Sequence, residues 1–206
     1  MASGGDPLNP EQPERFRRKP SIAERRAKRA EVDSPAVVLD AALRFLEARQ
    51  RSVAEVRRRL MTAGYRVELV DGAITRLGDL GILDDAAFTA AWVESRDRAR
   101  PRGERALRQE LRLKGVDRTL IDEALADRRP EPGGETDPDA AAAERLLGRH
   151  AAALGRIADP RARRQRAYAL LARNGFDPDA AARASTAFLR EAAEAMGPDD
   201  LRGESD

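Results

Sequence analysis

The sequence predicts an all-α fold: an elongated tandem array of three three-helix repeats that follows a disordered N-terminal tail. Three observations support this prediction: the composition, the helical spacing of apolar residues, and a short pattern that occurs three times. Of 206 residues, 36% are charged and only 4% are aromatic, and Ala, Leu, Arg and Glu are abundant. Straight-chain residues lose little rotamer freedom in a helix, so strands are not expected. The 41% hydrophobic content is enough to bury a core.

Residues 1–35 are expected to form the disordered tail. Charged residues predominate there, and few apolar residues are present to offset the entropy lost on folding. The basic segment 24–31 is expected to be at most a transient helix, because it has no apolar stripe with which to dock on a core. Five prolines interrupt the tail: Pro7, Pro10, Pro13, Pro20 and Pro35.

The first repeat, residues 36–83, contains three predicted helices. Ser52 and Glu55 have the spacing of a capping box, which opens the second helix. That helix buries Leu60 and ends at Gly64, and a third apolar-periodic helix follows it. The first helix is indicated by apolar residues at steps of three and four: Val38, Ala41, Ala42, Phe45 and Leu46.

A pattern around the end of the second helix then returns twice. It consists of a leucine, a glycine four residues later and an apolar residue directly after the glycine. A helix terminus needs a residue that accepts positive φ, and the apolar residue folds back over the last turn. The pattern therefore indicates tandem three-helix repeats, and the alternative is a chance recurrence in a helical protein that contains many leucines and glycines. It occurs at Leu60 and Gly64, at Leu111 and Gly115, and at Leu171 and Gly175.

These spacings predict the domain boundaries. The third repeat is the most divergent, since it is rich in alanine and follows a stretch of turn-forming residues. The predicted segments are repeat 1 at 36–83, repeat 2 at 84–129, a linker at 130–137, repeat 3 at 138–190 and an acidic tail at 191–206.

Asp84 and Asp85 open the second repeat. Paired carboxylates can perform acid–base or metal chemistry, but these two directly precede a helix. Asp84 is therefore interpreted as a helix cap, and Asp85 as a charge that favours the positive helix end. Phe88 and Trp92 lie one turn apart on the apolar face of this helix and are expected to anchor the core of the repeat, rather than to stack on nucleic-acid bases.

On these residues the sequence resembles the RecX family. The resemblance spans about residues 36 to 190, and the middle repeat matches best. Its motifs are Arg51-Ser52-Val53-Ala54-Glu55-Val56 with Leu60, Leu83-Asp84-Asp85 with Phe88 and Trp92, Gly103 with Arg108-Gln109-Glu110-Leu111, and Lys114-Gly115-Val116.

The resemblance implies both the fold and the function. RecX proteins are built from tandem three-helix repeats and modulate the RecA recombinase. A protein of this kind is expected to bind the RecA–DNA filament, to impede filament growth, ATP turnover and strand exchange in recombination and repair, and to catalyse no reaction itself. We expect a monomer whose partners are RecA and the RecA–DNA filament, with weak direct DNA contact at most.

A basic stretch in the second repeat is the candidate partner-binding site. Residues 96–118 hold nine basic and four acidic residues, although the whole chain carries a net charge of only +2. Arg105, Arg108 and Arg112 recur along one helix face, where guanidinium groups suit carboxylates and phosphates alike. A merely solvated face remains the alternative. The candidate residues are Arg102, Arg105, Arg108, Arg112 and Lys114.

A second function also stays open. Short three-helix units with basic second helices resemble helix-turn-helix modules, so the chain could bind DNA directly as a helical-repeat protein.

Several classes of site lack support in the sequence. The chain has no cysteine and one histidine, His150, which is expected to lie on a helix surface. No glycine-rich phosphate loop or metal-ligand cluster is found, so no cofactor, metal or catalytic residue is expected. The absence of an apolar targeting or membrane-spanning segment favours a cytoplasmic protein.

Overall fold

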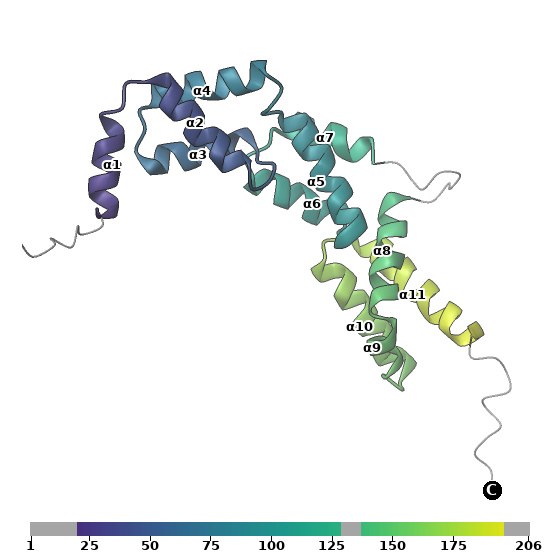
Figure 1. The fold of residues 1–206 in the computed structure, drawn as a ribbon. Coiled ribbons are helices and arrows are strands. Elements are labelled where there is room, and N and C mark those ends of the chain that lie inside the picture. The colour runs from purple at the N-terminus through teal and green to yellow at the C-terminus, as the bar shows by residue number, and fades with distance from the viewer. Residues whose placement is uncertain (1–19, 129–136, 196–206) are drawn as a thin grey trace, which may run out of the picture.

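The computed structural model describes residues 20–128 and 137–195, and these residues form eleven helices and no strand (Figure 1). The predicted all-α class and the elongated array are confirmed. The helices are α1 Ile22–Ala30, α2 Pro35–Leu46, α3 Val53–Ala63, α4 Val67–Asp79, α5 Asp85–Ala99, α6 Glu104–Leu113, α7 Arg118–Ala126, α8 Pro138–Arg149, α9 Ala151–Gly155, α10 Pro160–Arg173 and α11 Pro178–Ala195.

Each repeat buries its own apolar cluster. In the first, α2, α3 and α4 enclose Val38, Val56 and Leu77, all fully buried. In the second, α5, α6 and α7 enclose Leu107 and Leu111. Because each cluster is small, the units depend on one another for stability, as stacked repeats do.

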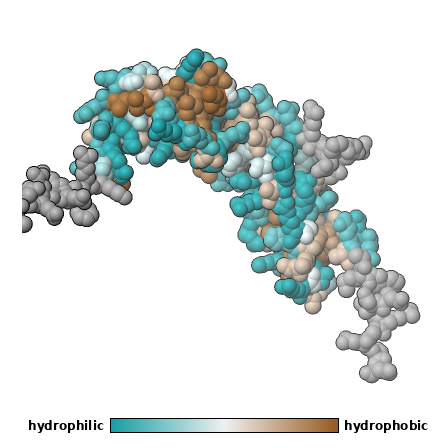
Figure 2. Space-filling view, in the orientation of Figure 1, coloured by the Kyte–Doolittle hydropathy of each residue, from teal (hydrophilic) through white to brown (hydrophobic). Residues whose placement is uncertain are grey.

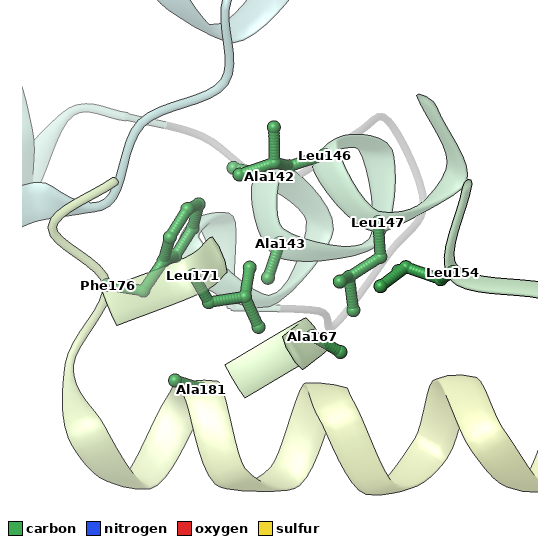
Figure 3. Packing of buried hydrophobic residues seen from close by; sticks show 9 residues of the cluster. All are labelled: Ala142, Ala143, Leu146, Leu147, Leu154, Ala167, Leu171, Phe176 and Ala181. Carbon is green, nitrogen blue, oxygen red and sulfur yellow. The ribbon is translucent and has the colours of Figure 1, made fainter. Parts of the chain in front are cut away.

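The third repeat has a different make-up. Small alanines let α8, α10 and α11 pack closely, and the side chains of Leu147, Leu171 and Phe176 converge between them (Figure 3). A short fourth helix, α9, lies between α8 and α10 and contributes Leu154 to this cluster. The expectation of three helices in this repeat missed α9 because a single helical turn is too short to show a periodic pattern.

The repeated glycines end helices as predicted. Gly64, Gly115 and Gly175 have φ angles of 104°, 77° and 79°, the left-handed region that side chains rarely adopt. In each case the following residue donates its backbone N–H to the carbonyl of the leucine five residues earlier, as in Tyr65 to Leu60. These bonds satisfy carbonyls that the helix leaves without a partner.

The described part of the predicted tail differs from the expectation. Residues 22–30 form α1, which begins with a capping box between Ser21 and Glu24 and packs against α3. The prediction that this segment lacks an apolar stripe was correct, since α1 buries no residue. However, α1 docks on α3 without such a stripe. Arginine side chains make the contact instead, because their long aliphatic stems pack while their charged ends stay in water.

The other predicted terminal and linker segments lie mostly outside the described residues. These are residues 1–19 of the tail, 130–136 of the linker and 196–206 of the acidic tail. The last helix, α11, continues beyond the predicted end of the third repeat to Ala195.

Candidate partner-binding surface of the second repeat

The candidate surface centres on α6, a strongly amphipathic helix. Leu107 and Leu111 are fully buried on its inner side, while Arg105 and Arg112 are exposed on its outer side. Neither arginine has an ion-pair partner among the residues that the structure describes. Both are therefore available to an anionic group of another molecule, and their role in binding one stays a prediction.

Arg108 lies on the same helix but is already neutralised. Its Nε donates to Glu104 Oε1 at 2.9 Å, and its guanidinium also pairs with Asp122 of α7. The hydrogen bond from Arg108 lowers the pKa of the Asp122 carboxyl. Arg108 thus ties α6 to α7 within the repeat.

Arg102 and Lys114 join the second repeat to its neighbours. Arg102 Nη1 donates to Asn174 Oδ1 of the third repeat at 2.6 Å. Lys114 Nζ donates to Glu55 Oε1 of the first repeat at 3.2 Å, and it lies 4.2 Å from the centre of the Trp92 ring. The structure therefore does not bring the five predicted basic residues together on one surface. Two of them are exposed, one forms ion pairs within the second repeat, and two bond to neighbouring repeats.

Trp92 lies at the edge of the core of the second repeat. Its ring is 5.9 Å from that of Phe88, which is buried, and its Nε1 donates to Glu110 Oε2 at 3.0 Å. Arg96 donates to the same carboxylate oxygen at 2.7 Å and stacks over the indole at 4.2 Å. With Lys114 also against the ring, Trp92 has little surface left for stacking on a base, which supports its predicted structural role.

Two further residues complete the exposed face of α6. Gln109 is exposed, and 70% of Leu113 is exposed despite its apolar side chain. With Arg105 and Arg112 they fall at i, i+4, i+7 and i+8, which is one face of a helix. The sequence interpretation missed Leu113 because it took leucines as core. The sequence did hold a signal of this exposure, since Leu113 directly follows Arg112 on the same helix.

The capping residues at the first junction behave largely as predicted. Ser52 and Glu55 form the capping box of α3, and Ser52 Oγ also donates to the carbonyl of Lys114 at 2.6 Å. Glu55 is partly buried, which raises its pKa, but hydrogen bonds from the Ser52 N–H, Lys114 and Arg49 outweigh this and lower the pKa overall. The cap of one repeat is thus also its link to the next.

Asp84 and Asp85 have separate roles. Asp84 Oδ1 accepts the backbone N–H groups of Ala86 and Ala87 at 2.8 and 3.0 Å, the predicted helix cap. Asp85 instead accepts the N–H of Val53 at 2.9 Å and so joins α5 to the start of α3. Burial raises the pKa of Asp85, the Val53 hydrogen bond opposes this, and the neighbouring charges of Asp84 and Glu55 raise it further.

Replacing Asp85 by asparagine is expected to flatten the pH dependence of stability. Because the pKa of Asp85 is raised in the folded state, the stability that this group contributes is present below about pH 4 and is lost as the pH rises through the folded pKa. Asparagine still accepts the Val53 N–H but carries no charge. The free energy of unfolding of the variant, measured with urea from pH 4 to 7, should rise relative to that of the unaltered chain as the pH increases. The same pH dependence in both proteins would contradict the raised pKa of Asp85.

The second junction combines ion pairs with close backbone packing. The guanidinium of Arg128, only 5% exposed, pairs with Asp97 at 2.6 Å and also with Asp139. Burial raises the pKa of Asp139, although hydrogen bonds from the Glu104 N–H and Arg128 oppose it. Nearby, the N–H of Gly103 donates to the Asn174 carbonyl at 3.0 Å. Such a paired, enclosed charge fixes one orientation of the third repeat.

Two kinds of feature are absent from the part of the chain that the structure describes. No group of three or more His, Asp or Glu side chains among them could hold a metal ion. Across residues 20–128 and 137–195, no helix is both long and apolar enough to cross a membrane.

The fold and this surface define the class: a helical-repeat protein that presents a basic and partly apolar helix face on a fixed scaffold. Comparison with known proteins is consistent with this class. The family model described as "RecX, first three-helix domain" matches residues 39–77, and that described as "RecX, second three-helix domain" matches residues 84–125. Each matched segment lies within one of the first two repeats.

Curated relatives extend the match. The chain is 33% identical over 138 residues to the regulatory protein RecX of Chlorobium phaeobacteroides (strain BS1), covering 67% of this chain and 84% of that one. It is 43% identical over 105 residues to that of Mycobacterium sp. (strain KMS), covering 51% of this chain. The chain spans about half, 54%, of the length of this mycobacterial relative. The chain belongs to the RecX family.

Solved structures show the same fold. The crystal structure of RecX from Lactobacillus salivarius superposes with a TM-score of 0.58 at 20% identity, covering 78% of this chain and 97% of that chain. A second crystal structure of regulatory protein RecX gives 0.57 at 23% identity, with 77% and 70% covered.

Proposed function

We propose that this chain regulates RecA by binding along the RecA–DNA filament and restraining its growth, ATP turnover and strand exchange. Membership of a family of regulatory proteins supports the class of function. The site rests on the exposed face of α6, where Arg105 and Arg112 form no ion pair with any residue that the structure describes. Arginine forks are suited to the carboxylates of a protein surface, and the exposed Leu113 adds apolar area to the contact.

The shape of the array supports the same proposal. Three small cores joined by polar junctions form a curved rod rather than a globule (Figure 1). An extended repeat surface can contact more than one subunit of a helical partner. A regulator that bridges adjacent subunits restrains them without any chemistry of its own.

Direct DNA binding is the second candidate, favoured by the exposed arginines. Co-sedimentation separates regulation of RecA from direct DNA binding. The chain is sedimented over a salt series with RecA–DNA filaments, with DNA alone and with RecA alone. If the chain regulates RecA, we expect it to bind the filament more tightly than DNA alone or RecA alone. Equal binding to bare DNA with a steep salt dependence would instead support the DNA-binding candidate.

The sharpest variant changes Arg105 and Arg112 together to alanine. Alanine favours helices, so α6 should persist, whereas including Arg108 would also break its ion pairs with Glu104 and Asp122. We expect unchanged circular dichroism and a clearly higher protein concentration for half-maximal inhibition of RecA's ATPase. Two charge-assisted contacts at about 1.5 to 3 kcal/mol each would shift that concentration by about a hundredfold or more.

A matched control removes the same charge elsewhere. Arg156 and Arg173 are exposed and have no ion pair within the described ranges, so changing both to alanine should leave inhibition unaltered. If the α6 variant inhibits as well as the unaltered chain, the binding face lies elsewhere. Equal weakening by both variants would indicate diffuse attraction and favour direct DNA binding.

A further inference from the structure

A groove between α1 and α3 is lined by an unusual concentration of positive charge. Its volume is about 340 Å³, and the surface over α1 is largely hydrophilic (Figure 2). None of the described residues that line it is acidic. The lining residues are Ile22, Arg25, Arg26, Arg29, Arg59, Thr62 and Ala63.

Local structure explains how these arginines come together. The capping box at Ser21 fixes the start of α1, and positions 25, 26 and 29 then follow within little more than one turn. Arg29 Nη1 donates to the Ala63 carbonyl at 3.5 Å, and its guanidinium lies 5.9 Å from the centre of the Tyr65 ring. Arg26 crosses the turn at Gly64 so closely that a Cβ there would overlap its side chain. Arg59 reaches the groove from α3.

The charges in this groove are not balanced internally. Among the described residues, no ion pair joins Arg25, Arg26, Arg29 or Arg59 to a carboxylate, in contrast to Arg108 with its two acidic partners. Like charges gathered in one groove repel one another, and a bound anion removes that repulsion. The arrangement therefore favours a ligand of high negative charge density.

We propose that this groove binds the phosphate backbone of a nucleic acid. Guanidinium forks match phosphate oxygens bidentately, and the Thr62 hydroxyl adds a hydrogen-bond donor to the lining. A nucleic-acid strand supplies negative charge at regular, close spacing, as a groove with four cations requires. None of the described residues that line the groove is aromatic, and the nearby rings of Tyr65 and Phe45 lie against Arg29 and Arg59. We therefore expect contact with the backbone rather than with the bases, and binding that is independent of sequence.

Binding at this position also has a structural consequence. Since α1 buries no residue, its attachment to α3 is weak, and its helix should open readily. A phosphate backbone that contacts Arg25 on α1 and Arg59 on α3 holds the two helices together. Ligand binding therefore slows hydrogen exchange of the α1 amides.

The test uses the full chain and a fluorescently labelled oligothymidylate, with RecA absent throughout, so that its outcome is independent of the proposed regulation of RecA. The Arg25→Gln/Arg59→Gln variant should bind at least tenfold more weakly. Its plot of log affinity against log salt should be shallower by about 1.4, since each lost contact to a single strand contributes about 0.7. The oligonucleotide should protect α1 from exchange in the unaltered chain and not in this variant.

Two further variants control for charge and folding. Arg156→Gln/Arg173→Gln removes equal charge from the third repeat and should keep both the affinity and the salt slope. Arg25→Lys/Arg59→Lys keeps the charge and should retain most of the affinity, which separates loss of binding from loss of structure. Unchanged affinity and slope in the first variant would overturn the proposal. Displacement of the oligonucleotide by polyglutamate at equal charge concentration would also overturn it, in favour of an acidic protein ligand.

Discussion

Replacing Gly103 by alanine is expected to lower the free energy of unfolding by about 2 to 3 kcal/mol, the upper part of the usual cost of overpacking. Gly103 is the N-cap of α6, and its φ of −71° suits any residue, so the effect is steric. An added Cβ would overlap backbone atoms of Gly175 and Phe176. Backbone cannot swing aside as a side chain can, and the third repeat must shift away from the second.

The matched control is Gly148, which lies within α8 and has no atom within 4 Å of an added Cβ. Alanine there should raise stability by about 0.5 to 1 kcal/mol, because glycine in a helix has more backbone entropy to lose. Urea unfolding followed by circular dichroism measures both changes. Similar effects from the two substitutions would contradict the close packing of the second and third repeats.

The second large effect is expected at Trp92, where alanine should cost about 3 to 5 kcal/mol. The substitution removes the contact with Phe88, leaves the Glu110 carboxylate without the indole N–H, and exposes the cations of Arg96 and Lys114. Phenylalanine keeps an aromatic ring but not the N–H, and should cost about 1 kcal/mol for the lost hydrogen bond.

Denaturation of both Trp92 variants can be followed by far-ultraviolet circular dichroism, which does not depend on tryptophan fluorescence. Tyr168→Ala offers a control for aromatic truncation, since Tyr168 is 37% exposed in the third repeat and should lose less stability. An unaffected midpoint in Trp92→Ala would mean that the indole does not anchor the second repeat, and would reopen a role in base stacking.

Features that depend on nearby residues were predictable from the sequence. The capping box of α3, the Asp84 cap and the left-handed glycines each rest on residues within five positions of one another. Their hydrogen bonds form within one turn, so the pattern contains all the necessary information. The threefold recurrence then located the repeats.

Features that depend on tertiary contact were not predictable in this way. The helical spacing of Arg108 indicated an exposed charge, but Asp122 reaches it from another helix. In the same way, the docking of α1 follows from Arg26 and Arg29 meeting the turn at Gly64, which no periodicity within α1 reveals. Sequence spacing proposed a basic face on α6, and only the fold shows which of its arginines pair with other described residues and which do not.

RecA's DNA-dependent ATPase is the most direct test of the proposed action of this chain on RecA. Purified chain is titrated into RecA assembled on single-stranded DNA, with filament length followed in parallel by electron microscopy. We expect ATP turnover to fall and filaments to shorten as the chain is added, and the Arg105/Arg112 variant to require a higher concentration for the same effect. ATPase activity and filament length that stay constant at a large excess of the chain would contradict it.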